Sequence, residues 1–247
     1  MSRGLLLSFL LVGSALAQVP APSATTDGRK LVQVSVEFIE VPANEANRLL
    51  IKEKLGKDGV KLHAELQSLM DHEKADSLET MLVTSTSGQK ATTESVREVI
   101  YPAEWEPIDL PTDRPLTVEE QKAKPPVPRY FPPVPTAFQT RNTGTNLEIE
   151  PSLSEDTKSI HLRLVPEIVL EAGTSRWNPY KDELGNESVV TQPVFYSLRT
   201  NTAITSGDGV PVLLSVLTPM TKEGVPDHSR KLFVIVTSDV VDATAAK

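Results

Sequence analysis

Two runs of alternating apolar and polar residues, separated by a short polar break, constrain the fold of this chain more than any other feature. Each run has a period of two, which places its apolar side chains on one face of a pleated strand. The apolar positions are Leu147, Ile149 and Leu153 before the break and Ile160, Leu162, Leu164, Ile168 and Leu170 after it. The break, Ser154 to Lys158, contains five polar residues and is typical of a hairpin turn. The segment from Thr140 to Ala172 therefore predicts a two-faced β-hairpin.

Further strands are predicted on the N-terminal side of this hairpin. Leu31 to Val41 alternates apolar and polar residues in the same way, with valines and a phenylalanine on one face. Leu78 to Thr86 and Ala91 to Ile100 have strand-like composition, and a turn at Ser87-Gly88 separates them. The expected core contacts of the second of these segments are Val96 and Val99.

The C-terminal part predicts a second hairpin and a closing strand. Gln192 to Ser206 is a long strand candidate, and Val210 to Thr218 is its expected antiparallel return after a tight turn at Gly207-Asp208-Gly209. The last strand, Leu232 to Thr237, is apolar on both faces, which is typical of a strand that is central or covered on both sides. Between the hairpins, Gly173 to Val189 is predicted to be a polar loop.

Two short helices are predicted after the first strand. We expect Asn44 to cap the first helix, which runs to about Leu55, where a glycine and the Asp58-Gly59 pair interrupt it. The second helix extends from Val60 to Lys74, because apolar residues recur there at helical spacing. These residues are Leu62, Leu66, Leu69 and Met70. The predicted fold class is therefore α+β, mainly β, built from amphipathic antiparallel hairpins.

Proline recurs throughout the segment from Tyr101 to Pro135, which ends in the run PPVPRYFPPVP. Such a segment favours extended polyproline II geometry and does not form a regular strand ladder. We interpret it as a semi-rigid connector; a P-x-x-P ligand or a plug-like loop is the alternative. The connector divides the chain into a strand-helix-helix-strand front half, residues 31–100, and an all-β back half, residues 136–242, followed by a short tail at residues 243–247.

Residues 1–17 have the features of a secretory signal peptide, and a polar lead-in follows at residues 18–30. Arg3 gives a positive start, and Leu5 to Val12 forms an apolar run ahead of small residues, so we predict cleavage between Ala17 and Gln18. The chain contains no cysteine, so neither a disulfide nor an N-terminal lipid is expected. No other segment approaches the roughly 20 apolar residues that a membrane-spanning helix needs.

The residue types that carry enzyme chemistry are few and poorly placed. His63 and His72 lie nine residues apart, about 900° of helical rotation, so they point in opposite directions and do not share a metal ion. Residues 84–90 lack the first glycine of a phosphate-binding loop and indicate a turn. Glu148 and Glu150 share a strand face as a catalytic pair would, but outward glutamates are ordinary on an amphipathic strand. We therefore predict no enzyme activity, cofactor or metal.

The charge balance excludes another class of partner. Lysine and arginine number 25 against 33 acidic residues, which gives a formal net charge of −8 and a pI near 5.1. No long basic run is present that would follow a phosphate backbone. We expect neither nucleic acid nor a small-molecule substrate as a partner.

Several short motifs occur in an order that matches a known family. The positions are Gly144, Leu147, Ile149 and Pro151, then Ile160, Leu162, Leu164, Pro166, Glu167 and Ile168, then Asp208 and Gly209, and finally Leu232 to Thr237. This order resembles the C-terminal domain of bacterial secretins, the outer-membrane rings of type II and type III secretion and of type IV pilus systems. Ser87 to Pro107 also resembles the strand and loop that precede the hairpin in that family. The likeness covers most of Leu31 to Asp242.

The resemblance implies an exported, non-enzymatic subunit of an oligomeric outer-membrane assembly that takes part in protein secretion. Its partners would be further copies of the chain or other envelope and secretion-system proteins. The polar residues Glu148, Glu150 and Arg163 would line the face opposite the apolar one. The family's gate segment is missing, because Val210 to Thr218 leads straight into the short loop Pro219 to Arg230. A soluble periplasmic interaction module with a secretin-derived fold and no pore is therefore the alternative, and an exported hydrolase is third.

Overall fold

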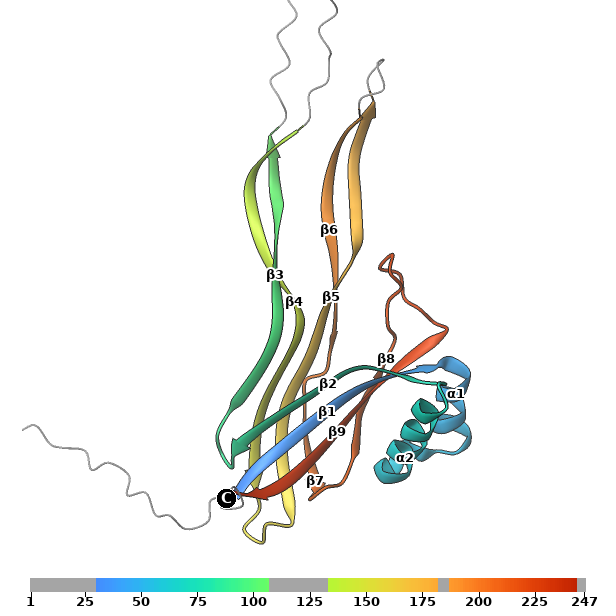
Figure 1. Cartoon of the computed structure of the whole chain (residues 1–247), viewed down its shortest axis with the longest axis vertical. Helices are drawn as coiled ribbons and strands as arrows, with labels where there is room; N and C mark the ends of the chain where they lie inside the picture. The colour runs from blue at the N-terminus through green and yellow to red at the C-terminus, as the bar shows by residue number, and fades with distance from the viewer. Residues whose placement is uncertain (1–29, 107–132, 182–186, 244–247) are drawn as a thin grey trace, which may run out of the picture.

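The computed structural model describes residues 30–106, 133–181 and 187–243 and shows two antiparallel β-sheets with a helical layer on one of them (Figure 1). One sheet is short, and the other extends far beyond it as long paired strands. The predicted signal peptide with its cleavage site at Ala17 and Gln18, and most of the proline-rich segment, lie outside the described residues. The predicted fold class is confirmed: strands dominate, and the helices follow the first strand.

The first sheet, which we call sheet A, has the strand order β2-β1-β9-β8. Its strands are β1 Lys30–Pro42, β2 Asp76–Thr86, β8 Val212–Leu217 and β9 Arg230–Asp242. β9 pairs with β1 on one side and with β8 on the other, which confirms that Leu232 to Thr237 is a central segment. Its alternate residues are buried in two different cores, so both of its faces are apolar.

Helices cover one face of sheet A. They comprise α1 Ala43–Asn47, a π-helical turn Arg48–Lys52, a 3₁₀ turn Leu55–Lys57 and α2 Gly59–Asp71. Leu62 and Leu66 of α2 pack with Phe233 and Ile235 of β9 in this second core. The expected cap was wrong: Pro42 occupies the N-cap of α1 and no side chain caps it, because the chain enters the helix directly from β1.

The N-terminus of α2 is fixed by two local features. The Asp58 carboxylate accepts a hydrogen bond from the backbone N–H of Lys61 at 3.1 Å, which satisfies one of the free amides of the first turn. Gly59 lies against the backbone before β8, where a Cβ atom would stand 1.9 Å from the carbonyl oxygen of Pro211. Only glycine permits this approach.

The second sheet, sheet B, has the strand order β3-β4-β5-β6, with β7 paired to β5. Its strands are β3 Ala91–Glu106, β4 Val134–Leu153, β5 Ser159–Lys181, β6 Glu187–Arg199 and β7 Thr202–Gly207. β4 and β5 form the predicted two-faced hairpin, with Leu153 opposite Ile160 at its closed end. The two halves predicted from the sequence interleave, because each contributes strands to both sheets.

The second predicted hairpin was wrong in two respects. The expected long strand from Gln192 to Ser206 breaks at Thr200 and Asn201 into β6 and β7, which pair with different parts of β5. Its expected return strand, β8, pairs with β9 in the other sheet. The reason lies in the intervening turn, where Gly209 donates its backbone N–H to the carbonyl oxygen of Ser238 at 2.9 Å. This hydrogen bond attaches the turn to β9, so the strand that follows the turn joins sheet A.

Two predicted loops begin later than expected. β3 continues to Glu106 through Pro102, which an edge strand tolerates because one of its sides has no ladder. β5 continues to Lys181 with irregular register after Glu171 and after Trp177, so the segment predicted as a polar loop is mostly strand. Val96 is 44% exposed, against expectation, because it lies on the outer face of sheet B with Glu94 and Glu98, away from the core face on which Thr93 pairs with Leu147.

Candidate assembly surface

The motif positions of the β4–β5 hairpin lie on the face that packs against sheet A. The buried members are Leu147, Ile149, Pro151, Ile160, Leu162, Leu164, Pro166 and Ile168. Most of them share one hydrophobic core with Val34 and Val36 of β1 and with Val234 and Val236 of β9. On the opposite face, Glu150, His161 and Arg163 are exposed and Glu148 is half-buried. The alternation in the sequence therefore separates a core face from a polar face.

Two further motif positions stabilise the turn between the sheets. Asp208 accepts a hydrogen bond from the backbone N–H of Val240 at 2.7 Å. Gly209 has a φ of 67°, in the left-handed region that favours glycine. The Asp-Gly pair thus attaches this turn to β9. Glu167 of β5 lies apart from the turn, with its carboxylate 3.9 Å from the guanidinium of Arg199 on β6.

Gly144 marks the point where sheet B divides. Pairing between β4 and β5 ends with Gly144 opposite Val169. Beyond this pair, β3 and β4 continue as one two-stranded arm and β5 and β6 as another (Figure 1). Gly144 has a φ of 123° at this bend. Two-stranded ribbons are marginally stable alone in water, so both arms benefit from further contacts.

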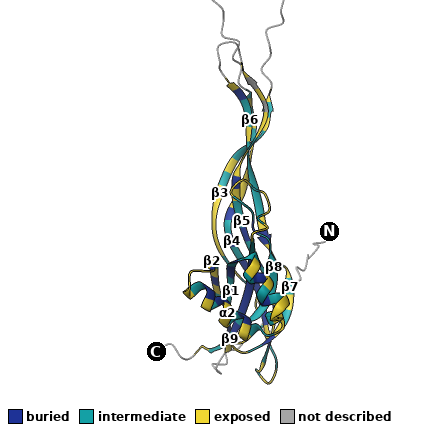
Figure 2. Cartoon of the chain, turned by 90° about the vertical axis from the view of Figure 1, so that its right-hand side faces the viewer, coloured by how far each residue is buried: buried dark blue, intermediate teal, exposed yellow. Residues whose placement is uncertain are grey.

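The arms expose large apolar side chains. Figure 2 shows that buried residues concentrate where the sheets and helices meet, while intermediate and exposed residues dominate the arms. The exposed apolar residues on the arms are Ile100 at 65%, Phe138 at 60%, Trp177 at 57% and Val134 at 50%. The rings of Tyr101 and Phe195 lie 5.6 Å apart between centroids and join β3 of one arm to β6 of the other. Exposed apolar patches of this kind mark interaction surfaces.

Both sheets leave strand edges unpaired, on the same two flanks of the molecule. Among the described residues, β2 pairs only with β1 and β3 only with β4, and the turn at Ser87 and Gly88 joins these two edge strands. On the other flank, among the same described residues, β8 pairs only with β9 and β7 only with β5, whereas the free edge of β6 lies toward β3 of the other arm, where Phe195 contacts Tyr101. Each flank therefore presents one edge from each sheet, and such edges are templates for another strand.

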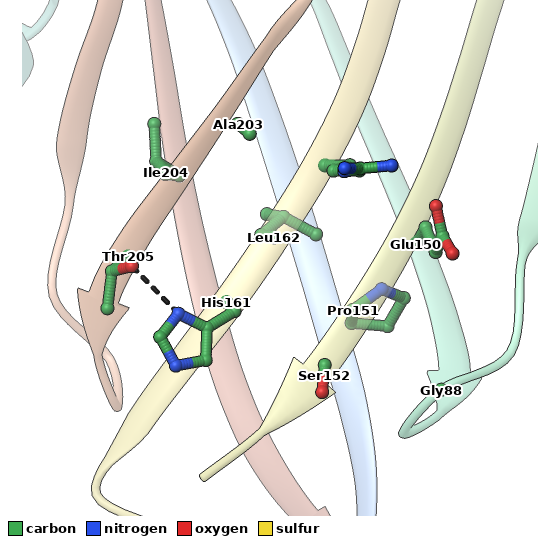
Figure 3. Close-up of a pocket in the computed structure, with 10 residues that line it drawn as sticks. Gly88, Glu150, Pro151, Ser152, His161, Leu162, Ala203, Ile204 and Thr205 are labelled. Atoms are coloured by element: carbon green, nitrogen blue, oxygen red, sulfur yellow. Dashed lines mark hydrogen bonds between the residues drawn. The ribbon is translucent and has the colours of Figure 1, made fainter.

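A shallow pocket lies on the polar face of the hairpin, between β4, β5 and β7 (Figure 3). His161 Nδ1 lies 2.9 Å from the Thr205 hydroxyl, which is its single hydrogen-bond partner within the described residues. Nearby, Lys90 Nζ and the Glu148 carboxylate form an ion pair at 2.7 Å. The exposed imidazole–threonine pair gives no positive sign of catalysis. In the described ranges, no cluster of three or more histidine, aspartate or glutamate side chains is arranged to hold a metal ion.

Charged groups in the helical layer and at its edge form two local networks. Arg48 lies 2.7 Å from Glu45, 2.6 Å from Glu53 and 3.8 Å from Glu65, and the first two bonds raise the pKa of its guanidinium. Arg230 of β9 binds Glu40 at 2.8 Å. Burial raises the pKa of the Glu40 carboxyl, and the attraction of Arg230 opposes this rise. No helix in the described part of the chain is long and apolar enough to cross a membrane.

Sequence reasoning did not identify the free edges, the divided sheet or these charge networks. The edges follow from pairings between strands that are far apart in the chain, such as β1 with β9, and no local pattern reveals them. The glycine at position 144 was noted as a motif position, but its bend at the division of the sheet was not foreseen. Glu45 lies three residues before Arg48, at helical spacing, which was the available signal for that cluster; Glu53 and Glu65 lie at other spacings.

No protein-family model matches the chain, and no curated protein matches it. Several solved structures are similar to it, all at low identity. The type II secretin GspD from enteropathogenic Escherichia coli has a TM-score of 0.42 and 13% identity over 86% of this chain and 69% of that one. GspD in the ETEC pilotin–secretin complex has a TM-score of 0.43 and 10% identity over 87% of this chain and 50% of that one.

InvG, the secretin of the Salmonella SPI-1 injectisome, has a TM-score of 0.37 and 11% identity over 89% of this chain and 65% of that one. The chain thus spans only half the length of the GspD subunit in the pilotin complex. Identities and TM-scores at this level do not assign the chain to a family.

Proposed function

We propose that the chain is a secretin-like exported envelope protein, a subunit of an oligomeric outer-membrane assembly that takes part in protein secretion. The observation that supports this most is the pair of matching flanks, each with a free strand edge from both sheets. The motif positions from Gly144 to Pro151, from Ile160 to Ile168 and at Asp208 and Gly209 supply the family resemblance.

The two unlike flanks support ring closure as the form of this assembly. The β2 and β3 edges of one copy differ from the β8 and β7 edges of the next, so the contact is head-to-tail and closes into a ring when the rotation permits. Closure would pair the strand edges on both flanks, and a membrane requires paired edges of β-structure because the hydrocarbon core offers no water to bind free amides. The apolar arms then find partners in neighbouring copies and in lipid.

The secretin resemblance and the predicted signal peptide also suggest a location and partners. The predicted signal peptide directs export, and its cleavage between Ala17 and Gln18 releases the mature chain to the periplasm or the outer membrane. Partners are further copies of this chain or other envelope and secretion-system proteins. No enzymatic step is part of the proposal.

One observation favours a second candidate, a soluble periplasmic interaction module without a pore. Both hydrophobic cores are built from residues of one chain, so the compact part of the subunit does not need neighbours to bury its core residues. The arms and the free edges would then bind a larger envelope complex by strand addition.

The deciding experiment is the native mass of the mature chain, extracted from cell envelopes in mild detergent and compared with the soluble fraction. A membrane-bound multimer of many subunits that resists heat and detergent is the expected result. A soluble monomer or dimer of the mature chain overturns the ring and leaves the interaction module.

A further inference from the structure

Helix α2 crosses sheet A from one flank to the other. Its first residue, Gly59, packs on Pro211 next to the start of β8. In the middle of the helix, His63 Nε2 lies 2.9 Å from Glu37 of β1, and the Gln67 amide donates to the same carboxylate at 3.0 Å. The chain leaves the helix and enters β2 at Asp76. The helix therefore has its N-terminal end at the β8 flank and its C-terminal end at the β2 flank.

The end of the helical layer at the β8 flank is basic. Its exposed lysines, which we call the basic end, are Lys52, Lys54, Lys57 and Lys61. Within the described residues, only Lys61 has an ion-pair partner, Asp58 at 2.9 Å. The neighbouring Glu53 is already bound to Arg48 at 2.6 Å. This surface therefore carries excess positive charge, although the formal net charge of the chain is −8.

The opposite end, at the β2 flank, is acidic. Its acidic residues, which we call the acidic end, are Asp71, Glu73 and Asp76, and one exposed lysine, Lys74, lies among them. Asp71 and Glu73 are exposed and have no ion-pair partner among the described residues. Asp76 lies 3.0 Å from Arg230, yet its side chain remains 77% exposed. The helical layer therefore has oppositely charged ends, one at each flank.

We propose that this charge polarity orders neighbouring copies, with the basic end of one copy docked on the acidic end of the next. The inference rests on the proposed ring, because the occupant of each end is a second copy of this chain. Head-to-tail contact brings opposite charges together beside the β8 and β2 edges. A head-to-head contact would instead place lysines against lysines, and this repulsion disfavours the wrong arrangement.

Charge reversal tests the proposal directly. The basic-end variant carries Lys54→Glu and Lys57→Glu, and the acidic-end variant carries Asp71→Lys and Glu73→Lys. The acidic-end variant is then positive at both ends, and in the basic-end variant the two glutamates cancel the remaining Lys52 and Lys61. Each variant alone should therefore lose at least tenfold in association at low salt. An equal mixture should regain association, because the two variants can alternate. A matched control, Lys158→Glu with Lys222→Glu, changes the net charge as much as the basic-end variant but at exposed loops away from both ends.

The outcomes separate this proposal from the ring itself. If the unaltered chain forms multimers and both variants alone do so equally well, the charge order is wrong and the ring stands. If the unaltered chain forms no multimer in detergent extracts, the ring is wrong, and sedimentation of the unaltered chain at low salt still tests the contact between the two ends. The absence of any association there overturns the charge order as well.

A membrane surface is the competing occupant of the basic end. Vesicles of phosphatidylglycerol are the probe, because they offer anionic headgroups without protein. Binding of the chain to these vesicles that the basic-end variant loses, with no association between the mixed variants, would reassign the lysines to lipid and overturn the proposal. Circular dichroism of each variant confirms that lost association does not reflect unfolding.

Discussion

Gly144 of β4 lies so close to Ser95 of β3 that a Cβ atom on Gly144 would stand 2.1 Å from the Ser95 carbonyl oxygen. The same glycine has a φ of 123°, which side chains rarely allow. Both constraints occur where β4 stops pairing with β5 and the sheet divides into its arms. Gly144 therefore joins the compact part of the molecule to the surface that we propose for assembly.

Replacing Gly144 with alanine should destabilise the subunit. The backbone strain alone costs about 1–3 kcal/mol, and the overlap with β3 adds to it because β3 must move away. Urea unfolding of the mature chain measures the loss. Gly88→Ala is the matched control, since Gly88 also has a positive φ, 78°, but a Cβ there meets nothing within 4 Å. Equal losses in the two variants would contradict the steric argument.

The assignment of faces in the β4–β5 hairpin predicts opposite outcomes at adjacent residues. Leu162 is 1% exposed in the core between the sheets, so Leu162→Lys buries an unpaired charge and should cost about 4 kcal/mol or more, or abolish any multimer. Arg163 is exposed, so Arg163→Ala should change the free energy of unfolding by no more than about 0.5 kcal/mol. Denaturation and native mass of both variants are the measurements. Intact stability and assembly in Leu162→Lys would refute the strand-face assignment.

Local periodicity was sufficient to predict this hairpin, because alternation with a period of two determines which side chains share a face. It was insufficient for Val96. Thr93 lies opposite the buried Leu147, so Val96 lies on the other, outer face of sheet B with Glu94 and Glu98. The break at Thr200 and Asn201 was also missed. The strand pattern continues through these residues, and only the change of position along β5 separates β6 from β7.

The candidate surface was less predictable than the fold. The secretin-like motif positions were read from the sequence, but the free edges depend on long-range pairings such as that of β1 with β9, which closes sheet A across most of the chain. The switch of β8 into sheet A depends on the Gly209 bond to Ser238, and a tight turn in the sequence looks the same whether or not it changes sheets.

Asp58 should contribute to acid unfolding. The Lys61 side chain and the Lys61 backbone N–H lower the pKa of the Asp58 carboxyl below its ordinary value of 3.8. The contribution of Asp58 to the free energy of unfolding is thus fully present above pH 3.8 and is lost as the pH falls through the lowered pKa. Asp58→Asn keeps the helix cap but does not titrate, so its thermal midpoint should fall less steeply with acid than that of the parent chain. Parallel curves would contradict this role.

Glu40 should have the opposite pH dependence. Burial raises the pKa of its carboxyl above 4.5, so the folded chain holds this proton more readily than the unfolded one. Stability from this group is therefore present at low pH and declines as the pH rises through the raised pKa. Glu40→Gln removes the titration, so the stability of the variant relative to the parent should increase across that interval. A relative stability that stays constant from pH 4 to 7 would show that Glu40 titrates alike in both states.

The exposed apolar residues of the arms should matter for assembly and little for the fold of one chain. Ile100 and Phe138 are 65% and 60% exposed, so Ile100→Ser with Phe138→Ser removes few contacts within the subunit, and we expect a change within about 0.5 kcal/mol per site. The same variant should lose the detergent-resistant multimer, because those side chains are the surface available to neighbours or lipid. Leu147→Ala is the contrasting control: Leu147 is fully buried, so this variant should lose about 2–5 kcal/mol. An arm variant that assembles normally would exclude the arms from the assembly surface.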